Sequence, residues 1–185
     1  MCRIPSAFAV LAWIFVACIG RADDQLRTVR VLTYNIHHGE GTDGNFDLDR
    51  IARVIRAASP DLVALQEVDQ KTKRSGGIDQ LQKLAELTGL HPAYGRAMDY
   101  QGGAYGVAML SRWPLKESRT HSLPSDPGVE PRVVLSAELT IGETGSNVHF
   151  LVTHVDHRAD PTQRTMQLAK LREIFPAKPD QGLSI

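Results

Sequence analysis

The sequence predicts an α/β protein with a mixed sheet or two packed sheets and helices on the outside. In the first half of the chain, apolar strand-like runs alternate with amphipathic helix patterns, which is typical of βαβ units. In the second half, strand-like runs follow one another closely, and a further helix begins only near Pro161. The chain has 185 residues, of which 42% are hydrophobic and 23% charged, and these values suit a single globular domain.

The boundaries of the expected elements follow from local patterns. Asp47 and Asp79 are placed to cap two helices, because an aspartate accepts a hydrogen bond from the first turn. Gly89 provides the expected end of the second helix. Residues 28–36 are rich in β-branched residues, and residues 61–66 form an apolar run typical of a buried strand. We expect strands at 28–36, 61–66, 92–96, 105–111, 115–121, 132–141 and 148–155, helices at about 47–58, 79–89 and 160–175, a polar loop at 68–78, and no internal repeat.

The first 22 residues have the pattern of a secretory signal peptide. Arg3 precedes an apolar stretch at 4–19, and Ala22 is a small residue at the expected cleavage point. The stretch is short for a membrane span. We therefore expect a signal peptide at 1–22, a domain at 23–185, and a secreted or periplasmic protein. Two alternatives stay open: an uncleaved N-terminal membrane anchor and, with less support, a lipid anchor at Cys18.

Cysteine content and charge restrict the chemistry of this domain. Both cysteines, Cys2 and Cys18, lie in the predicted signal peptide, so the domain has no thiol nucleophile and no cysteine metal site. The whole chain has 21 basic and 21 acidic residues, and removal of Arg3 and Arg21 leaves 19 basic against 21 acidic. A protein held to nucleic acid by its phosphates usually has a basic excess. The balance disfavours non-specific nucleic-acid binding and leaves room for a local basic patch.

Three residues that can bind a metal or a phosphate lie at the ends of predicted strands. These are Asn35, Glu67 and His154. Active sites of α/β proteins form at the carboxyl ends of strands. A carboxylate and an amide oxygen suit Mg²⁺ or Mn²⁺, and a histidine can bind a phosphate or act as an acid or base. Each residue alone also has an ordinary structural interpretation, as a turn cap, a surface ion pair or a bonded core histidine.

Further candidates lie in the predicted loops and at a strand start. Arg132 could bind a phosphate through its planar fork of donors or form a surface ion pair with Glu130. Arg74 could bind substrate, although loop arginines are usually solvated. His37 shares a strand face with Asn35. The pair of His37 with the next residue, His38, raises the possibility of a zinc site, but the sequence offers no third ligand with suitable spacing.

Four segments resemble the endonuclease/exonuclease/phosphatase superfamily. They are TYNIHHG (33–39), PDLVALQEVD (60–69), YGVAMLSRWPL (105–115) and THVDHRAD with a downstream RTMQ (153–167). The tract KTKRSGGIDQ (71–80) is similar to a secreted bacterial branch of metal-dependent hydrolases. The resemblance implies a four-layer α/β sandwich, in which two packed mixed sheets are flanked by helices.

The resemblance also implies a reaction and residue roles. The reaction is metal-dependent hydrolysis of a phosphoester, with Glu67 as the main Mg²⁺ ligand and Asn35 beside it. His154 is implied to contact the scissile phosphate, His37 to face the metal, and Arg132 to lie near the phosphate. The expected partner is a phosphoester substrate, which could be a small molecule, a lipid head group or nucleic acid, and no obligate protein partner is evident.

One departure from the family pattern concerns its late motifs. Relatives continue with a strand ending in Gly-Asp-x-Asn and, later, an Asp-His pair, and this sequence has neither motif. We therefore expect the N-terminal part of a C-terminally truncated domain. The alternative is a non-catalytic or binding form of the same fold.

Overall fold

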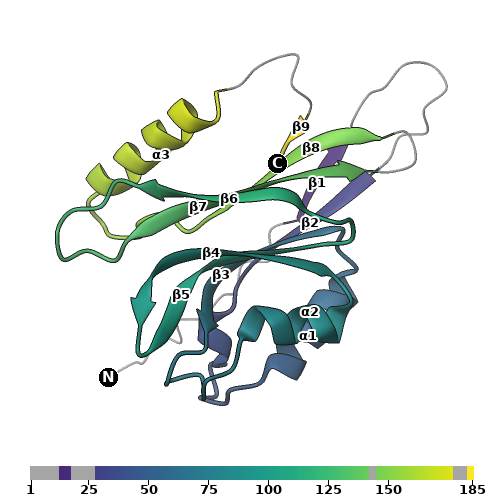
Figure 1. Cartoon of the computed structure of the whole chain (residues 1–185), viewed down its shortest axis with the longest axis horizontal. Helices are drawn as coiled ribbons and strands as arrows, with labels where there is room; N and C mark the ends of the chain where they lie inside the picture. Colours follow the sequence, from purple (N-terminus) through teal and green to yellow (C-terminus); the bar gives the residue numbers. More distant parts are fainter. Residues whose placement is uncertain (1–12, 18–27, 142–144, 177–182) are drawn as a thin grey trace, which may run out of the picture.

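The computed structural model describes residues 13–17, 28–141, 145–176 and 183–185. Its elements form four layers, in the order helices, sheet, sheet and helix (Figure 1). This arrangement confirms the predicted fold class of two packed sheets flanked by helices. Most of the predicted signal peptide, residues 1–12 and 18–22, lies outside the described residues. Within the described ranges, none of the helices combines the length and the apolar character needed to cross a membrane.

The first sheet has five strands in the order β1-β2-β3-β5-β4. Strands β2 and β3 are parallel, as expected for a βαβ unit, and the other neighbours are antiparallel. The parallel pair brings the carboxyl ends of β2 and β3 to the same edge. The strands are β1 (Trp13–Ala17), β2 (Thr28–Asn35), β3 (Leu62–Gln70), β4 (His91–Tyr100) and β5 (Gly103–Ser111).

Helices α1 (Leu48–Ala58) and α2 (Gln80–Thr88) cover the outer face of this sheet (Figure 1). Both predicted caps are present, because the Asp47 carboxylate accepts from the Arg50 backbone N–H at 2.7 Å and Asp79 caps α2 in the same way. Gly89 ends α2 with a left-handed backbone, φ 72°. The apolar faces of the two helices pack on the sheet in one hydrophobic core.

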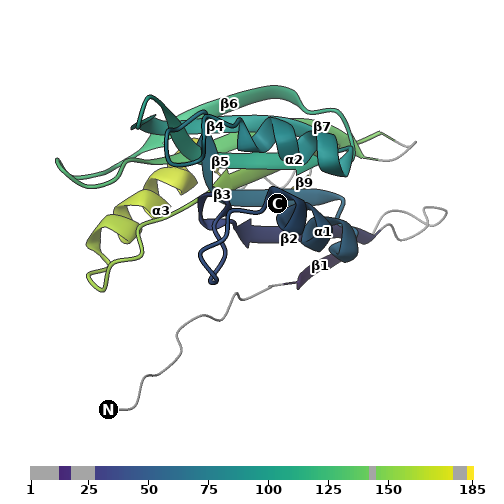
Figure 2. The same cartoon turned by 90° about the horizontal axis from the view of Figure 1, so that it is seen from below.

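The second sheet has four strands in the order β6-β7-β8-β9. It packs against the first sheet through a second core, which includes Met109 from β5, Leu135 from β7 and Phe150 from β8. Helix α3 (Thr162–Ile174) lies on its outer side, opposite α1 and α2 (Figure 1). In the view from below, α1 and α2 lie in front of the strands (Figure 2). The strands are β6 (Lys116–Leu123), β7 (Arg132–Ile141), β8 (Ser146–Thr153) and β9 (Leu183–Ser184).

Strand β3 is longer than the sequence predicts. The apolar run led us to expect a strand over 61–66 and a loop from 68, whereas β3 continues to Gln70 through a β-bulge. Its pairing with β5 jumps from Leu65 to Val68. The bulge allows both of these apolar side chains to pack in the same core, and it turns Glu67 away from that core. The loop prediction was therefore wrong for residues 68–70.

Candidate active site

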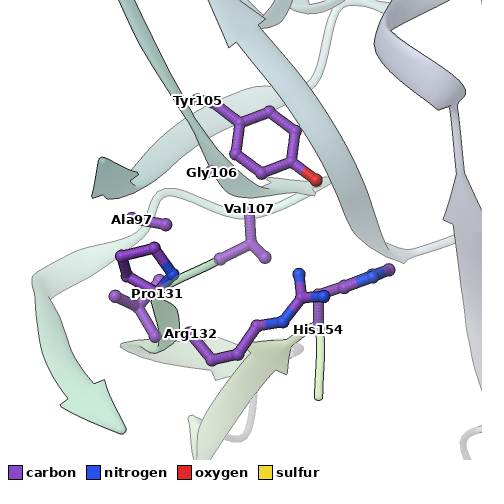
Figure 3. A pocket seen from close by; sticks show the side chains of 8 residues that line it. Ala97, Tyr105, Gly106, Val107, Pro131, Arg132 and His154 are labelled. Atoms are coloured by element: carbon purple, nitrogen blue, oxygen red, sulfur yellow. The ribbon is translucent and has the colours of Figure 1, made fainter. Parts of the chain in front are cut away.

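A cleft of about 220 Å³ opens at the edge where β2, β3 and β8 end and β7 begins. Its lining combines acidic, basic and aromatic side chains from both sheets. Figure 3 shows Tyr105 of the first sheet facing Arg132 and His154 of the second. The lining residues are His37, His38, Glu67, Arg74, Met98, Tyr100, Tyr105, Glu130, Arg132, His154 and His157.

The structure brings all six site candidates from the sequence to this cleft. Five of them line it: His37, Glu67, Arg74, Arg132 and His154. The sixth, Asn35, donates from its amide Nδ2 to Glu67 Oε1 at 2.6 Å, while its Oδ1 accepts from the His37 backbone N–H at 2.9 Å. Asn35 therefore links β3 to the turn that follows β2. The structure thus shows that the six candidates lie together. Their chemical roles stay predictions.

Glu67 occupies an unusual backbone conformation. Its φ is 59°, in the left-handed region that residues with a side chain rarely adopt. The cause is the bulge in β3, which leaves Glu67 outside the regular ladder and aims its carboxylate into the cleft. Strained residues of this kind cluster at active and ligand sites because the surrounding structure has to hold them.

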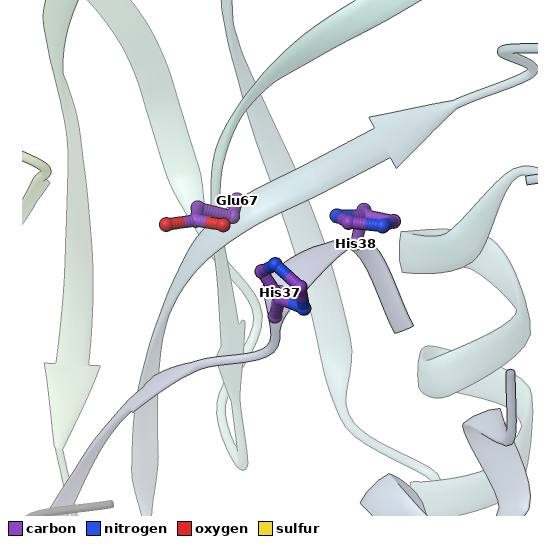
Figure 4. A group of neighbouring side chains, drawn as sticks. All are labelled: His37, His38 and Glu67. Atoms are coloured by element: carbon purple, nitrogen blue, oxygen red, sulfur yellow. The ribbon is translucent and has the colours of Figure 1, made fainter. Parts of the chain in front are cut away.

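His37 and His38 lie in a short 3-10 turn, His37–Gly39, which follows β2. Both have positive φ, 46° and 43°, and Gly39 follows at φ 90°. The positive φ favours glycine at position 39, and a Cβ there would also meet the exposed Phe46 ring at 2.8 Å. The two imidazoles and Glu67 converge, with one potential ligand atom of each within 4.8 Å of the others (Figure 4).

His154 approaches Glu67 from the opposite sheet. Its Nε2 lies 3.9 Å from Glu67 Oε1, and both side chains are about four-fifths buried, at 21% and 22% exposure. Burial lowers the pKa of His154 below its ordinary value, and the positive charge of Arg132 lowers it further. The nearby carboxylates of Glu67 and Glu130 oppose this shift without cancelling it. Burial and Arg132 thus favour the neutral imidazole, which can accept a proton at one ring nitrogen and donate a hydrogen bond from the other.

Arg132 begins β7 and is only 5% exposed. Its Nη1 donates to Glu130 Oε1 at 2.5 Å, so the predicted ion pair exists but is not a surface pair. Its buried Nε has no hydrogen-bond partner among the described residues. A buried guanidinium with an unused donor is costly unless something accepts from it, and a phosphate oxygen in the cleft would do so.

Arg74 is held in place rather than solvated. It donates through Nε and Nη2 to the two oxygens of the buried Asp69 carboxylate, at 2.7 and 2.8 Å. Its guanidinium also lies 4.6 Å from the centre of the Tyr100 ring, a distance typical of cation–π contacts. The alternative of an ordinary solvated loop arginine is therefore wrong, and most of its charge is compensated by Asp69.

Comparison with known proteins identifies the family. A family model described as "PGAP2IP, C-terminal nuclease-like domain" matches residues 26–183. The chain belongs to this family. It is 31% identical over 159 residues to the uncharacterized protein YbhP of Escherichia coli K12, a match that covers 82% of this chain and 62% of YbhP. It is also 27% identical over 146 residues to the Schizosaccharomyces pombe protein cwh43, covering 79% of this chain and 14% of cwh43.

Solved structures agree on the superfamily. An endonuclease/exonuclease/phosphatase from Beutenbergia cavernae superposes with a TM-score of 0.67 at 28% identity, over 78% of this chain and 43% of that one. The catalytic domain of human Nocturnin, solved with a bound sulfate, has the same fold, with a TM-score of 0.58 at 21% identity over 83% of this chain and 65% of that one. The resemblance to this superfamily is confirmed. Its fold is that of phosphoesterase- and nuclease-type hydrolases, which generally use divalent metal ions.

Sequence reasoning missed two buried glutamines that support the site. Gln80, at the start of α2, accepts from the Asp69 backbone N–H at 2.8 Å and donates to the His38 carbonyl at 2.5 Å. Gln167, in α3, accepts from the Asp156 N–H at 2.8 Å and donates to the Pro124 carbonyl at 3.0 Å. Each glutamine is fully buried and follows its aspartate by 11 residues. Each therefore fastens a strand end to the neighbouring loop.

A repeat in the sequence would have revealed these glutamines. The segment V-D with a later Q-L-x-K-L-x-E occurs twice, so that positions 67, 69 and 80 correspond to 154, 156 and 167, at a constant spacing of 87. We expected no internal repeat. This recurrence is easily missed because few residues in the two copies are identical. In this correspondence Glu67, in β3, matches His154, which directly follows β8.

The donor set fits a divalent ion. Glu67 offers carboxylate oxygens that face the cleft. The amide nitrogen of Asn35 donates to this carboxylate, and its amide oxygen accepts from the His37 backbone N–H. Oxygen donors of this kind suit Mg²⁺ or Mn²⁺. Glu67 would hold the ion, and Asn35 would orient its carboxylate.

Proposed function

We propose that this chain carries the metal-binding and phosphate-binding part of a phosphoester hydrolase that uses Mg²⁺ or Mn²⁺. The observation that carries the proposal is the convergence of Glu67, His154 and Arg132 from two different sheets on one cleft. A carboxylate, a neutral imidazole and a buried guanidinium together match the charge distribution of a metal-bound phosphate.

Glu67 is proposed to hold the ion, with Asn35 orienting its carboxylate through the 2.6 Å hydrogen bond. When bound, the ion polarises a phosphoryl oxygen and neutralises charge on the leaving oxygen. The 2.9 Å bond from the His37 N–H fixes the orientation of the Asn35 amide. The bulge in β3, which turns the Glu67 carboxylate into the cleft, supports this role.

Arg132 and His154 are proposed to bind the phosphate itself. The unpartnered Nε of Arg132 provides a donor that a phosphate oxygen can use. His154 is neutral because of its burial, so its protonated ring nitrogen can donate a second hydrogen bond without bringing a further charge. In the hydrolysis, a water oxygen bonds to phosphorus as the ester P–O bond breaks, and the leaving oxygen takes up a proton.

The substrate is proposed to be a small or lipid-linked phosphoester rather than nucleic acid. Both arginines that line the cleft are paired with carboxylates, Arg74 with Asp69 and Arg132 with Glu130. These pairs leave little excess positive charge for a polyanion, which binds mainly through phosphate neutralisation.

Export is proposed on the basis of the pattern in residues 1–22. The N-terminal residue of the protein made in a bacterial host tests it. Asp23 as the first residue supports a cleaved signal peptide, whereas an intact N-terminus in the membrane fraction supports the anchor.

The function is tested by assaying the purified protein with bis(p-nitrophenyl) phosphate and p-nitrophenyl phosphate, with Mg²⁺ or Mn²⁺ and with EDTA. We expect turnover that requires the metal and that Glu67→Gln reduces by about 100-fold or more, the scale found when a group that stabilises transition-state charge is removed. The matched control is Glu86→Gln, since Glu86 is exposed on α2 away from the cleft.

Equal turnover after removal of the metal, or full activity in Glu67→Gln, would overturn the proposal. No turnover of either substrate with metal present would favour the non-catalytic form of the fold, in which the metal and phosphate sites bind without hydrolysis.

A further inference from the structure

We propose that His37, His38 and Glu67 together form a site for a first-row transition-metal ion of the zinc class, with imidazole as well as carboxylate ligands. The inference rests on the proposed function for the role of Glu67 as a metal ligand, and it narrows the proposed ion to a transition metal in place of Mg²⁺. The two adjacent histidines lack a third ligand in the sequence, and the fold supplies it from β3. One potential ligand atom of each residue lies within 4.8 Å of the others (Figure 4).

One ring nitrogen of each imidazole already has a hydrogen-bond partner. His37 Nδ1 lies 3.3 Å from the Glu40 carbonyl oxygen, and His38 Nε2 lies 3.2 Å from the Glu40 carboxylate. The second nitrogen of each ring has no hydrogen-bond partner in the described part of the chain. Metal-binding histidines typically show this pattern, in which a carboxylate or carbonyl fixes one nitrogen and the other binds the ion.

The backbone supports the same assignment. Seven non-glycine residues of the described chain have positive φ, and His37, His38 and Glu67 are three of them. A left-handed conformation costs about 1–2 kcal/mol per residue, so its occurrence at all three donors is not expected from packing alone. Strain concentrated at one group of side chains is typical of a site that is held ready for a ligand.

Two side chains hold the three donors against each other. Asn35 bonds to the Glu67 carboxylate and to the His37 backbone N–H. Gln80 bonds to the His38 carbonyl and to the backbone two residues beyond Glu67. The turn and the strand end are therefore tied on both sides of the cluster, which limits the reorganisation needed when an ion binds.

The donor types select the class of ion. Imidazole nitrogen suits Zn²⁺ and its neighbours in the first row, whereas Mg²⁺ prefers oxygen. Bonds of about 2.1 Å require ligand atoms closer together than the 4.8 Å that bounds their present separation, so small side-chain rotations would complete the site. Three protein ligands leave a fourth position open toward the cleft, as in catalytic zinc sites.

The test measures binding directly. Metal-free protein is titrated with Zn²⁺ by calorimetry and with Co²⁺ by visible absorption, which reports nitrogen ligands and low coordination number. The variants are His37→Asn and His38→Asn, because asparagine tolerates positive φ while it removes the imidazole. His91→Asn is the matched control, since His91 is exposed on β4. Thermal unfolding verifies that each variant is folded.

We expect one Zn²⁺ per chain, and a loss of Zn²⁺ affinity of about 10- to 100-fold or more in each of the two variants, since even outer partners of metal ligands have effects of this size. Mg²⁺ is expected to compete poorly. Unchanged Zn²⁺ binding in either variant, or an equal loss in His91→Asn, would overturn the inference. Because these readouts need no turnover, Zn²⁺ binding without hydrolysis would count only against hydrolysis by this chain, and hydrolysis with Mg²⁺ but no imidazole-dependent binding would refute only this site.

Discussion

The backbone strain at Glu67 can be measured by comparing two substitutions at that position. Glu67→Ala and Glu67→Gly remove the same carboxylate and the same hydrogen bond to Asn35. They differ in how well they tolerate φ of 59°. Alanine keeps the left-handed penalty of about 1–2 kcal/mol, whereas glycine avoids it but loses about 0.5–1 kcal/mol through its more flexible unfolded chain. We therefore expect the glycine variant to be more stable than the alanine variant by about 0.75 kcal/mol.

The free energy of unfolding of both variants is measured by urea titration, with equal slopes as the sign that the unfolded state is unchanged. Thr120 provides the control, because it is exposed on β6 and does not have positive φ. There, glycine should be less stable than alanine by about 0.5–1 kcal/mol. The order of the two variants should thus reverse between the two positions. An alanine variant at 67 that is as stable as the glycine variant would refute the argument that the bulge strains this residue.

Three further predictions concern the supports and the phosphate side of the cleft. Gln80→Leu leaves two buried backbone groups unpaired and should lower the free energy of unfolding by about 2 kcal/mol or more; a loss no larger than that of Gln82→Leu, at an exposed position of α2, would contradict it. Because the pKa of His154 is lowered on folding, the unfolded chain takes up this proton first, so stability should fall as the pH drops below 6.5. This proton should change the free energy of unfolding by at most about 1.4 kcal/mol per pH unit. Urea titrations at several pH values should show a weaker pH dependence of this free energy in His154→Gln than in the unsubstituted chain. Equal pH dependence in the two proteins would contradict the burial argument. Arg132→Lys should weaken binding of inorganic phosphate, measured by calorimetry with Mg²⁺ present, by about 10-fold, since lysine lacks the planar fork of donors; an unchanged dissociation constant would exclude a direct contact.

Sequence reasoning works best here where a local pattern has one physical meaning. Asp47 and Asp79 were predicted as helix caps because an aspartate before an amphipathic run has few other roles, and both predictions were confirmed. The convergence of Asn35 and Glu67 could be expected because parallel strands end at the same edge. The structure shows that these two side chains lie together, whereas their roles in metal binding stay predictions.

The sequence could not reveal features that depend on contacts between distant segments. The bulge at Glu67 arises because Leu65 and Val68 both enter the same core, which no local pattern specifies. Arg74 looks like a solvated loop residue until Asp69 and Tyr100 are placed around it. Glu67 becomes a partner for the two histidines only when β2 and β3 pair. These interactions decide the chemistry of the cleft, and all of them are tertiary.

The equivalent anchoring of the two strand ends has a consequence for cooperativity. Gln80 fastens the Glu67 side to the first sheet, and Gln167 fastens the His154 side to the second, so the gap between them depends on how far apart the sheets lie. Side chains between the sheets, such as Met109 and Leu135, fix that spacing. A ligand that contacts both sides would bind only while the two sheets stay together, and it would stabilise the folded chain by linkage. The fraction of chains with ligand in the cleft would then depend on the fraction in which the two sheets are packed together.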